Sequence, residues 1–254
     1  MILNSKIIGK SSNCIIILHG LFGSLDNWFS IGKELSDTFQ VHLVDLTNHG
    51  KSFHTNEHNY ELMSKDVYNY IKHYQIKNAS IIGHSMGGKV AMVFSTYYSQ
   101  LIKNLIVVDI APRKYNNEHQ IIINALSEIS TIKLDSRKDA EAILNKYGIN
   151  QQTSQFLLKN LFWSKDENLI FRFNLNAIKK SIHDLLDFPI EFETVKIKSF
   201  FIRGTKSTYI NEDDLKFINE KFSNSTLIDI FGAGHWVHFD QRKKFIETIK
   251  KITV

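Results

Sequence analysis

IIGHSMGGK, residues 81–89, places a serine between glycines directly after a short apolar run. Residues 83–87 form the pattern G-x-S-x-G, with Ser85 at its centre. The apolar run at 79–83 predicts a buried strand, and residues 89–98 predict a helix. On such a strand-to-helix turn the serine hydroxyl stands exposed above the sheet edge, next to the helix N-terminus. We therefore interpret Ser85 as a nucleophile rather than as a hydroxyl in a structural turn.

Short β-branched runs alternate with helical patterns on both sides of this turn. They cover residues 14–18, 41–46, 79–83, 105–110, 199–204 and 226–231. Continuous apolar runs of this length are typical of strands that are buried on both faces, as in a parallel sheet. Helical spacing follows in residues 60–74, 89–98 and 240–251. The sequence therefore predicts an α/β fold with a mostly parallel sheet flanked by helices.

The alternation stops between Pro112 and Pro189, the two prolines of the sequence. Three helical segments, and no strand, are expected there: residues 121–129, 139–148 and 175–186. Such an insertion predicts a helical cap or lid over an active site, and a helical subdomain without a gating role is the alternative. We expect the α/β core to comprise residues 1–112 and 189–254, and the cap residues 113–188.

A serine nucleophile needs a base, and in proteins with this turn the base is a histidine late in the chain. FGAGHWVHF, residues 231–239, follows the strand expected at 226–231 and holds His235 in a glycine-rich loop. His238 is the alternative, but it lies closer to the terminal helix. We assign the base to His235. His19 is expected to brace its own loop, and His84 to be packed beside the nucleophile.

The acid that orients the base is less clearly marked. Many proteins of this fold carry it after the strand at 199–204, but Ser207 stands at that place here. Asp109 ends the buried strand at 105–110, where an unpaired carboxylate would be costly and a histidine partner would explain it. We favour Asp109. The alternatives are three later carboxylates that look like helix-start residues: Glu212, Asp213 and Asp214.

Acyl transfer also requires two N–H donors for the tetrahedral intermediate. Met86, which follows the nucleophile, is expected to supply one of them. The other is expected from Leu21 in LHGLFGSLDNW, residues 18–28, because Gly20 and Gly23 allow a close backbone approach. A flexible turn without a catalytic role is the alternative reading of this loop.

The substrate pocket is expected to draw on aromatic residues, although aromatic residues on helices belong more often to the core. The candidates are Phe22, Trp163, Phe171, Phe173 and Trp236, together with Ser207. Three basic residues flank the cap and are candidates for contact with a phosphate of coenzyme A: Arg113, Lys114 and Arg172. For these three, a solvated position is the alternative.

Composition limits the classes of partner. The 254 residues carry a net charge of +5, but the lysines are scattered and no nucleic-acid motif is present, so we expect no nucleic-acid partner. The single cysteine, Cys14, excludes a disulfide framework and a cysteine metal site, and the expected chemistry requires no metal or organic cofactor. No apolar run or targeting segment predicts membrane association, so we expect a cytoplasmic protein. Its expected oligomeric state is a monomer or a homodimer.

Several segments, taken in order, resemble the small bacterial YbfF-type esterases of the α/β-hydrolase superfamily. They are HGLFGSLDNW, DLTNHGKS, IGHSMGGK, VVDIAP, FRFN, RGTKSTYI and GAGHWVH. The resemblance runs from about residue 14 to the end of the sequence. It implies an α/β-hydrolase fold with a sheet of about eight strands and a helical cap. It also implies hydrolysis of short-chain acyl esters, with acyl-CoA thioesters as a second class of substrate.

The same resemblance implies a role for each motif residue. Ser85 matches the family's nucleophile, His235 its base and Asp109 its acid, and Ser207 matches a serine that stands in place of the usual acid. The sequence departs from the family at Thr47, where an arginine is usual, so any ion pair of that arginine is absent.

Other functions of the same fold remain as alternatives. A C–C bond hydrolase or a menaquinone-pathway lyase could share these residues, and a hydrolase fold kept as a non-catalytic binding protein is a third possibility. Dehalogenases and epoxide hydrolases carry an aspartate where Ser85 stands, which disfavours both. The substrate that we expect is a small acyl ester or thioester.

Overall fold

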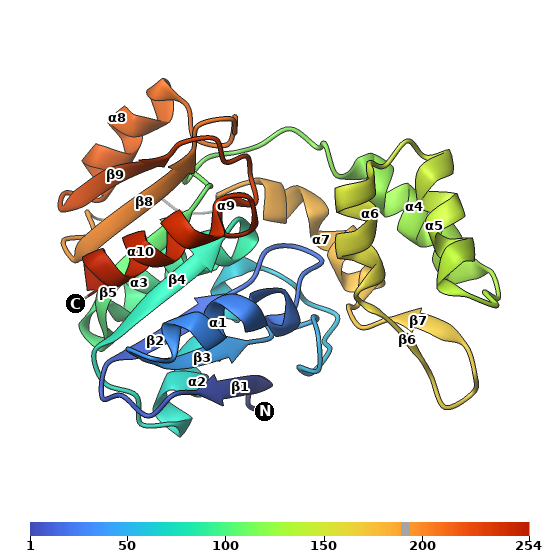
Figure 1. Ribbon diagram of the computed structural model, residues 1–254, viewed down its shortest axis with the longest axis horizontal. Helices are drawn as coiled ribbons and strands as arrows, with labels where there is room; N and C mark the ends of the chain where they lie inside the picture. Colours follow the sequence, from blue (N-terminus) through green and yellow to red (C-terminus); the bar gives the residue numbers. More distant parts are fainter. Residues whose placement is uncertain (189–193, 254) are drawn as a thin grey trace.

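The computed structural model describes residues 1–188 and 194–253, in which strands and helices alternate (Figure 1). The core strands are β1 Ser5–Ile8, β2 Cys14–Leu18, β3 Gln40–Val44, β4 Ala79–His84, β5 Ile102–Val108, β8 Lys198–Gly204 and β9 Ser225–Ile230. The core helices are α1 Phe29–Leu35, α2 Tyr60–His73, α3 Met86–Tyr98, α8 Glu212–Lys221, α9 Val237–Asp240 and α10 Arg242–Thr253. Two short 3-10 helices lie at Leu25–Trp28 and Ser99–Leu101.

Within the described residues, seven strands form the main sheet, in the order β1-β3-β2-β4-β5-β8-β9. The pairing is parallel throughout except between β1 and β3, which run antiparallel. The expected fold is confirmed, and the part of the sheet that the structure describes has one strand fewer than the eight expected. All six apolar runs coincide with strands of the sheet, whereas β1 was not predicted. Its side chains at the sheet edge are half-buried or exposed, so it lacks a continuous apolar run.

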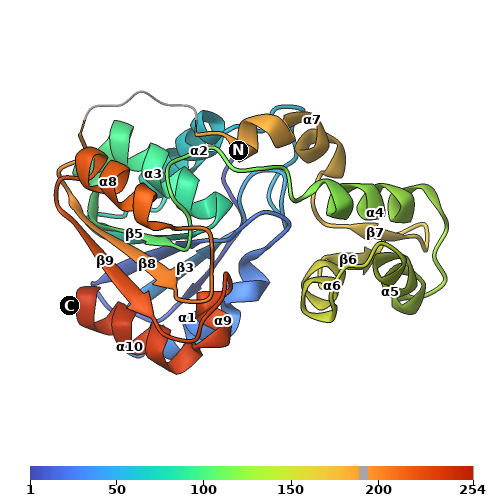
Figure 2. The same cartoon turned by 90° about the horizontal axis from the view of Figure 1, so that it is seen from above.

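The sheet is buried on both faces, which explains the uninterrupted apolar runs. Figures 1 and 2 show α2, α3 and α8 on one face and α1 and α10 on the other. In β2, Ile16 and Leu18 belong to one core cluster, and Ile15 and Ile17 belong to the other. Alternate side chains of a strand point to opposite faces, so both faces here require apolar residues.

The segment between β5 and β8 contains more than the three predicted helices. Its helices are α4 Gln120–Thr131, α5 Arg137–Lys146, α6 Gln151–Leu158 and α7 Leu175–Leu186, and β6 Leu161–Trp163 pairs with β7 Leu169–Phe171 in an antiparallel hairpin. The expectation of no strand is wrong, because three-residue strands are too short to show an alternating pattern. Figures 1 and 2 show α4, α5, α6 and the hairpin beside the sheet, with α7 between them and the core. The boundary expected at Pro189 falls outside the described residues.

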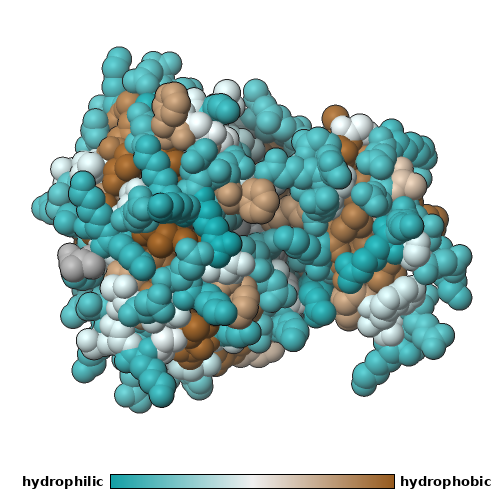
Figure 3. Space-filling model, viewed as in Figure 1, coloured by the Kyte–Doolittle hydropathy of each residue, from teal (hydrophilic) through white to brown (hydrophobic). Residues whose placement is uncertain are grey.

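No helix among the described residues has the length and apolarity needed to cross a bilayer. Figure 3 shows, on one face of the molecule, separate apolar areas within a largely hydrophilic surface.

Candidate active site

Ser85 occupies a strained turn between β4 and α3. Its backbone has φ 52° and ψ −121°, in a region that non-glycine residues seldom adopt. Two glycines are required by the packing: a Cβ at Gly83 would lie 2.2 Å from the carbonyl oxygen of Gly87, and one at Gly87 would lie 2.5 Å from that of Leu18. Helix α3 begins at Met86, three residues before the predicted start. The turn therefore presents the serine at the N-terminal end of a helix, where the dipole favours negative charge.

Asp109 lies directly after β5, is fully buried and has φ 52°. Its Oδ2 is 2.8 Å from Nδ1 of His235, and its Oδ1 accepts a 3.0 Å hydrogen bond from the Gly204 N–H. The Ser207 hydroxyl also donates to Oδ2. A histidine that donates its Nδ1–H to a buried carboxylate presents Nε2 as a base. The structure thus brings together Asp109, Ser207 and His235 from three different loops.

The alternative acids and the alternative base have other partners. Glu212 pairs with Arg203 at 2.9 Å, and Asp214 pairs with Arg113 at 2.7 Å while also closing the capping box of α8. Asp213 lies in the exposed first turn of that helix. His238 stacks on the Trp28 ring with centroids 3.9 Å apart. Burial, assisted by repulsion from His235, lowers the pKa of His238 to about 3, so the ring is neutral at ordinary pH.

Two side chains hold His235 in place. His84 Nε2–H donates to the His235 carbonyl oxygen at 2.9 Å, and the Tyr209 ring stacks on the imidazole with centroids 3.8 Å apart. Burial lowers the pKa of His84 well below its ordinary value, and repulsion from His235 and, to a smaller extent, from His238 adds to this effect. The role of Tyr209 was not predicted. The only signal in the sequence was its position two residues after Ser207. In the structure the Tyr209 N–H donates to the Ser207 hydroxyl at 3.2 Å.

The expected oxyanion donors flank Ser85. Met86 is the first residue of α3, so its N–H has no acceptor within the helix. In the described part of the chain the Leu21 N–H has no acceptor either, whereas the Phe22 N–H is used by a 3.3 Å contact with His49 Nε2. His19 braces the loop, since its Nδ1–H donates to the Gly20 carbonyl and its Nε2 accepts from the Leu46 N–H. Two N–H groups next to the serine are thus available to a ligand.

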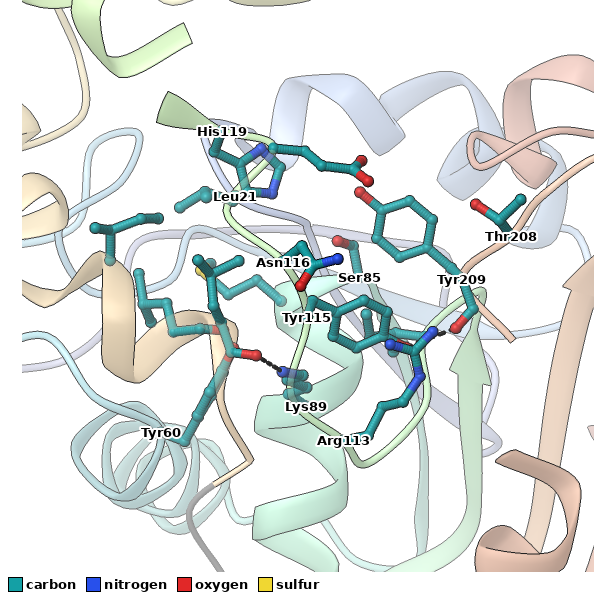
Figure 4. Close-up of a pocket in the computed structure, with 16 residues that line it drawn as sticks. Leu21, Tyr60, Ser85, Lys89, Arg113, Tyr115, Asn116, His119, Thr208 and Tyr209 are labelled. Carbon is teal, nitrogen blue, oxygen red and sulfur yellow. Dashed lines mark hydrogen bonds between the residues drawn. The ribbon is translucent and has the colours of Figure 1, made fainter. Parts of the chain in front are cut away.

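Two cavities meet at Ser85. The larger, of about 320 Å³, is lined mainly by apolar and aromatic groups, among them Phe22, Trp28, Phe156, His235, Trp236 and Phe239. The smaller, of about 150 Å³, lies along α3 and the start of the cap, and its lining includes Tyr60, Met86, Lys89, Arg113, Tyr115 and Leu185 (Figure 4). Leu21, Ser85, Glu118, His119 and Tyr209 border both cavities. The serine therefore stands between two spaces that differ in size and polarity.

Of the six residues predicted for the pocket, two border a cavity beside Ser85 and four lie elsewhere. Phe22 and Trp236 line the larger cavity. Trp163 is half exposed on the cap hairpin, because that hairpin projects away from the core. Phe171 and Phe173 stack on each other and border a separate depression, although Phe173 also touches Phe22. Ser207 borders neither cavity, because its hydroxyl is turned to Asp109.

The basic residues near the cap each have a partner in the chain. Arg113 pairs with Asp214 and lies over the Tyr115 ring, Lys114 lies 3.6 Å from Asp187, and Arg172 lies over the Phe162 ring. This arrangement gives no support to a coenzyme A phosphate site. Across residues 1–188 and 194–253, no group of three or more histidine, cysteine or acidic residues could hold a metal ion.

The cap is fastened to the loops that carry the site. Asn160, after α6, donates its side-chain amide to the Phe22 carbonyl at 2.8 Å. The Asn174 N–H donates to the Asn48 carbonyl at 2.9 Å. At Thr47, where the family usually has an arginine, the hydroxyl donates to Asp66 instead. The loop after β3 thus gains a different polar anchor.

Comparisons with known proteins agree with this geometry. The family model described as alpha/beta hydrolase fold matches residues 13–129. A putative esterase/lipase of Haemophilus influenzae is 36% identical over 93% of this chain and 82% of its own length. Esterase YbfF of Escherichia coli is 31% identical over 93% of this chain and 91% of its own. A solved marine microorganism esterase has a TM-score of 0.95 and 40% identity, and the match covers 98% of each chain. The chain therefore belongs to the α/β-hydrolase fold family, within the group of relatives that includes the Escherichia coli esterase YbfF.

Proposed function

We propose that this protein is a serine hydrolase that cleaves short-chain carboxylic esters through an acyl-enzyme on Ser85. The observation that carries the proposal is the 2.8 Å contact of Asp109 with His235, whose ring borders the same cavity as Ser85. The relatives that are named as esterases support the ester bond as the target. Acyl-CoA thioesters remain a second class of substrate within this proposal.

The mechanism consists of two acyl transfers. His235 Nε2 removes the proton of the Ser85 hydroxyl, whose oxygen attacks the acyl carbon to give a tetrahedral oxyanion. When the oxyanion collapses, the bond to the leaving oxygen or sulfur breaks and the imidazolium returns its proton to that atom. Water, deprotonated by the same imidazole, then attacks the acyl-enzyme. The carboxylic acid product leaves, and the imidazolium returns the proton to the Ser85 oxygen. Asp109 stabilises the imidazolium in both steps.

The oxyanion is stabilised by groups that are already in place. The N–H groups of Leu21 and Met86 supply two hydrogen bonds, and the N-terminus of α3 adds a favourable dipole. Removal of one such donor typically lowers kcat by about 10²–10³-fold. Because Phe22 N–H is engaged with His49, we assign the second donor to Leu21.

A fluorophosphonate probe tests the proposal directly. We expect it to label the wild-type protein on Ser85, because only an activated serine reacts with the phosphorus centre. Ser85→Ala should abolish labelling and ester hydrolysis. Ser95→Ala is the matched control, because this buried serine lies on the same helix and its hydroxyl donates to the Met92 carbonyl.

The outcome separates catalysis from ligand binding. A folded wild-type protein that is not labelled would contradict the proposal and favour a non-catalytic binding protein. Labelling that persists in Ser85→Ala would place the nucleophile elsewhere.

A further inference from the structure

The proposed mechanism assigns the two cavities to the two halves of an ester. His235 must protonate the leaving group, and it borders the larger cavity but not the smaller one in the described part of the chain. The leaving alcohol therefore lies in the larger cavity. The acyl chain extends from the opposite side of the reacting carbon, where Met86 borders the smaller cavity. This step rests on the proposed function.

The size of the smaller cavity restricts the acyl group. Its volume of about 150 Å³ is close to that of an engineered protein cavity that holds benzene. A space of this size suits an acyl chain with about six non-hydrogen atoms beyond the reacting carbonyl group. Ile110, Ile182 and Leu185 supply apolar walls for the methylene groups.

Lys89 gives this cavity an unusual polar group. It follows Ser85 by four residues, its backbone N–H donates to the Ser85 carbonyl at 3.1 Å, and both residues border this cavity. Its side chain is almost fully buried, and Nζ donates to the carbonyl oxygens of Leu186 at 3.0 Å and Asp187 at 2.8 Å. Figure 4 shows Lys89 and Ser85 among the side chains that surround the cavity. An ammonium has three N–H donors, and contacts with described residues use two of them, which leaves one for a ligand.

The surroundings of Lys89 favour a neutral acceptor over an anion. Both present partners are neutral carbonyl oxygens, and the carboxylate of Glu118 borders the same cavity. The Nζ atom lies 4.9 Å from the centre of the Tyr115 ring and 5.7 Å from that of Tyr60. Burial lowers the pKa of Lys89 to about 7, against the opposing effect of Asp187. Only the ammonium form has a third N–H beyond the two used by Leu186 and Asp187, so donation to a ligand requires the protonated lysine.

We propose that the smaller cavity is the acyl-binding site and that Lys89 selects acyl groups carrying a second, neutral carbonyl oxygen. The apolar walls hold the chain, and the Lys89 ammonium donates to the distal carbonyl. Lys89 thereby determines specificity at the site where Ser85 forms the acyl-enzyme.

Two esters that differ at a single carbon test this inference. Benzyl 4-oxopentanoate and benzyl pentanoate share a leaving group and a chain length, and only the first has a distal carbonyl. For the wild type we expect kcat/KM to be about ten- to a hundredfold higher for the oxo ester, as for a hydrogen bond to a charged group. In Lys89→Met the ratio should fall to about one.

The chain offers a matched control for the loss of a lysine. Lys103 Nζ donates to the Thr253 carbonyl at 3.4 Å, at the end of α10, so it too contacts a helix C-terminus. Lys103→Met should keep the wild-type ratio. A purely structural role of Lys89 would lower kcat/KM for both esters equally and leave their ratio unchanged.

The failures of the two proposals are distinguishable. A wild-type ratio near one, with both esters hydrolysed, would overturn the role of Lys89 while leaving the esterase function intact. A ratio preserved in Lys89→Met would overturn it as well. Absence of hydrolysis together with absence of fluorophosphonate labelling would instead refute the proposed function. The wild-type ratio keeps the inference open to refutation even when the variant is too unstable to assay.

Discussion

Asp109 Oδ2 lies 2.8 Å from His235 Nδ1, although 126 positions separate the two residues in the sequence. The carboxylate is fully buried, whereas about a quarter of the His235 side chain is exposed. A buried carboxylate without a partner would be strongly disfavoured, so the contact explains why an aspartate ends an otherwise apolar strand. The same contact directs the other ring nitrogen toward the cavity, where a base is needed.

Replacement of this carboxylate tests the acid. Asp109→Asn keeps the size of the side chain but removes the charge and the acceptor that fixes the tautomer of His235. We expect kcat to fall by about 10³–10⁴-fold with a short-chain ester, because the imidazole is then wrongly protonated. Glu212→Gln serves as the control, since Glu212 pairs with Arg203, and it should retain activity. Loss of activity in Glu212→Gln alone would show that the acid is misassigned.

The hydroxyl of Ser207 supports the acid. It donates to Asp109 Oδ2 and accepts a hydrogen bond from the Tyr209 N–H. Ser207→Ala leaves both groups short of a partner, so we expect kcat/KM to fall about tenfold. Steady-state kinetics of the variant, with its thermal unfolding measured alongside, separates this effect from loss of fold. An unchanged kcat/KM would mean that the Gly204 N–H and His235 suffice to hold the carboxylate.

Tyr209 is expected to act as a positioning residue for the base. Its ring stacks on His235 and its carbonyl accepts from the Tyr115 hydroxyl, which in turn accepts from the Ala111 N–H near the acid. Tyr209→Leu removes the stacked ring, so we expect kcat to fall about tenfold while the unfolding temperature changes little. Tyr209→Phe retains the ring and should retain kcat. Equal loss in both variants would point to the hydroxyl rather than to the stack.

Acid should destabilise the protein through its buried histidines, and His58 is the clearest case. Within the described residues neither of its ring nitrogens has a hydrogen-bond partner, and burial, assisted by His19, lowers its pKa to about 4. A histidine whose pKa is lower in the folded than in the unfolded state contributes stability above pH 6.5, and this contribution is lost as the pH falls toward 4. For His58 the loss is about 2–3 kcal/mol at pH 4.5.

Urea unfolding at a series of pH values measures this contribution. His58→Leu removes the titrating ring at similar volume, so the free energy of unfolding should fall less steeply between pH 6.5 and 4.5 than in the wild type. The slope is compared rather than the absolute stability, because repacking changes the latter at every pH. Identical slopes would show that His58 is not the source of the acid sensitivity.

The sequence predicted the elements whose burial leaves a local pattern. The six apolar runs mark strands packed on both faces, and Tyr60, Met63, Val67 and Tyr70 mark the buried side of α2. Strands that are only half-buried or very short leave no such pattern. This is why β1 and the strands of the β6–β7 hairpin were not predicted. The described part of the sheet also has one strand fewer than the eight expected from the family.

The strained turn at Ser85, the candidate nucleophile, could be predicted because its constraints are local. The turn at Ser85 has a positive φ and packs Gly83 against Gly87, so glycines must flank the serine within a few residues. The contacts around the base join distant parts of the chain. His84, at the end of β4, and Tyr209, after β8, contact His235, and Ser207 donates to Asp109. A pattern within one segment does not show which of these groups meet.

The pocket was decided by the tertiary structure alone. Trp163 and Phe171 are aromatic, as pocket residues often are, but they lie on a hairpin beside the core. Lys89 shows no functional pattern in the sequence, yet it is buried and borders the same cavity as Ser85. The fold class, the strained turn and the choice of Ser85 as the candidate nucleophile could be predicted from the sequence, because each leaves a pattern among neighbouring residues. Which side chains surround the bound substrate depends on how the cap packs against the sheet, since that packing alone brings α3 and the end of α7 together at Lys89.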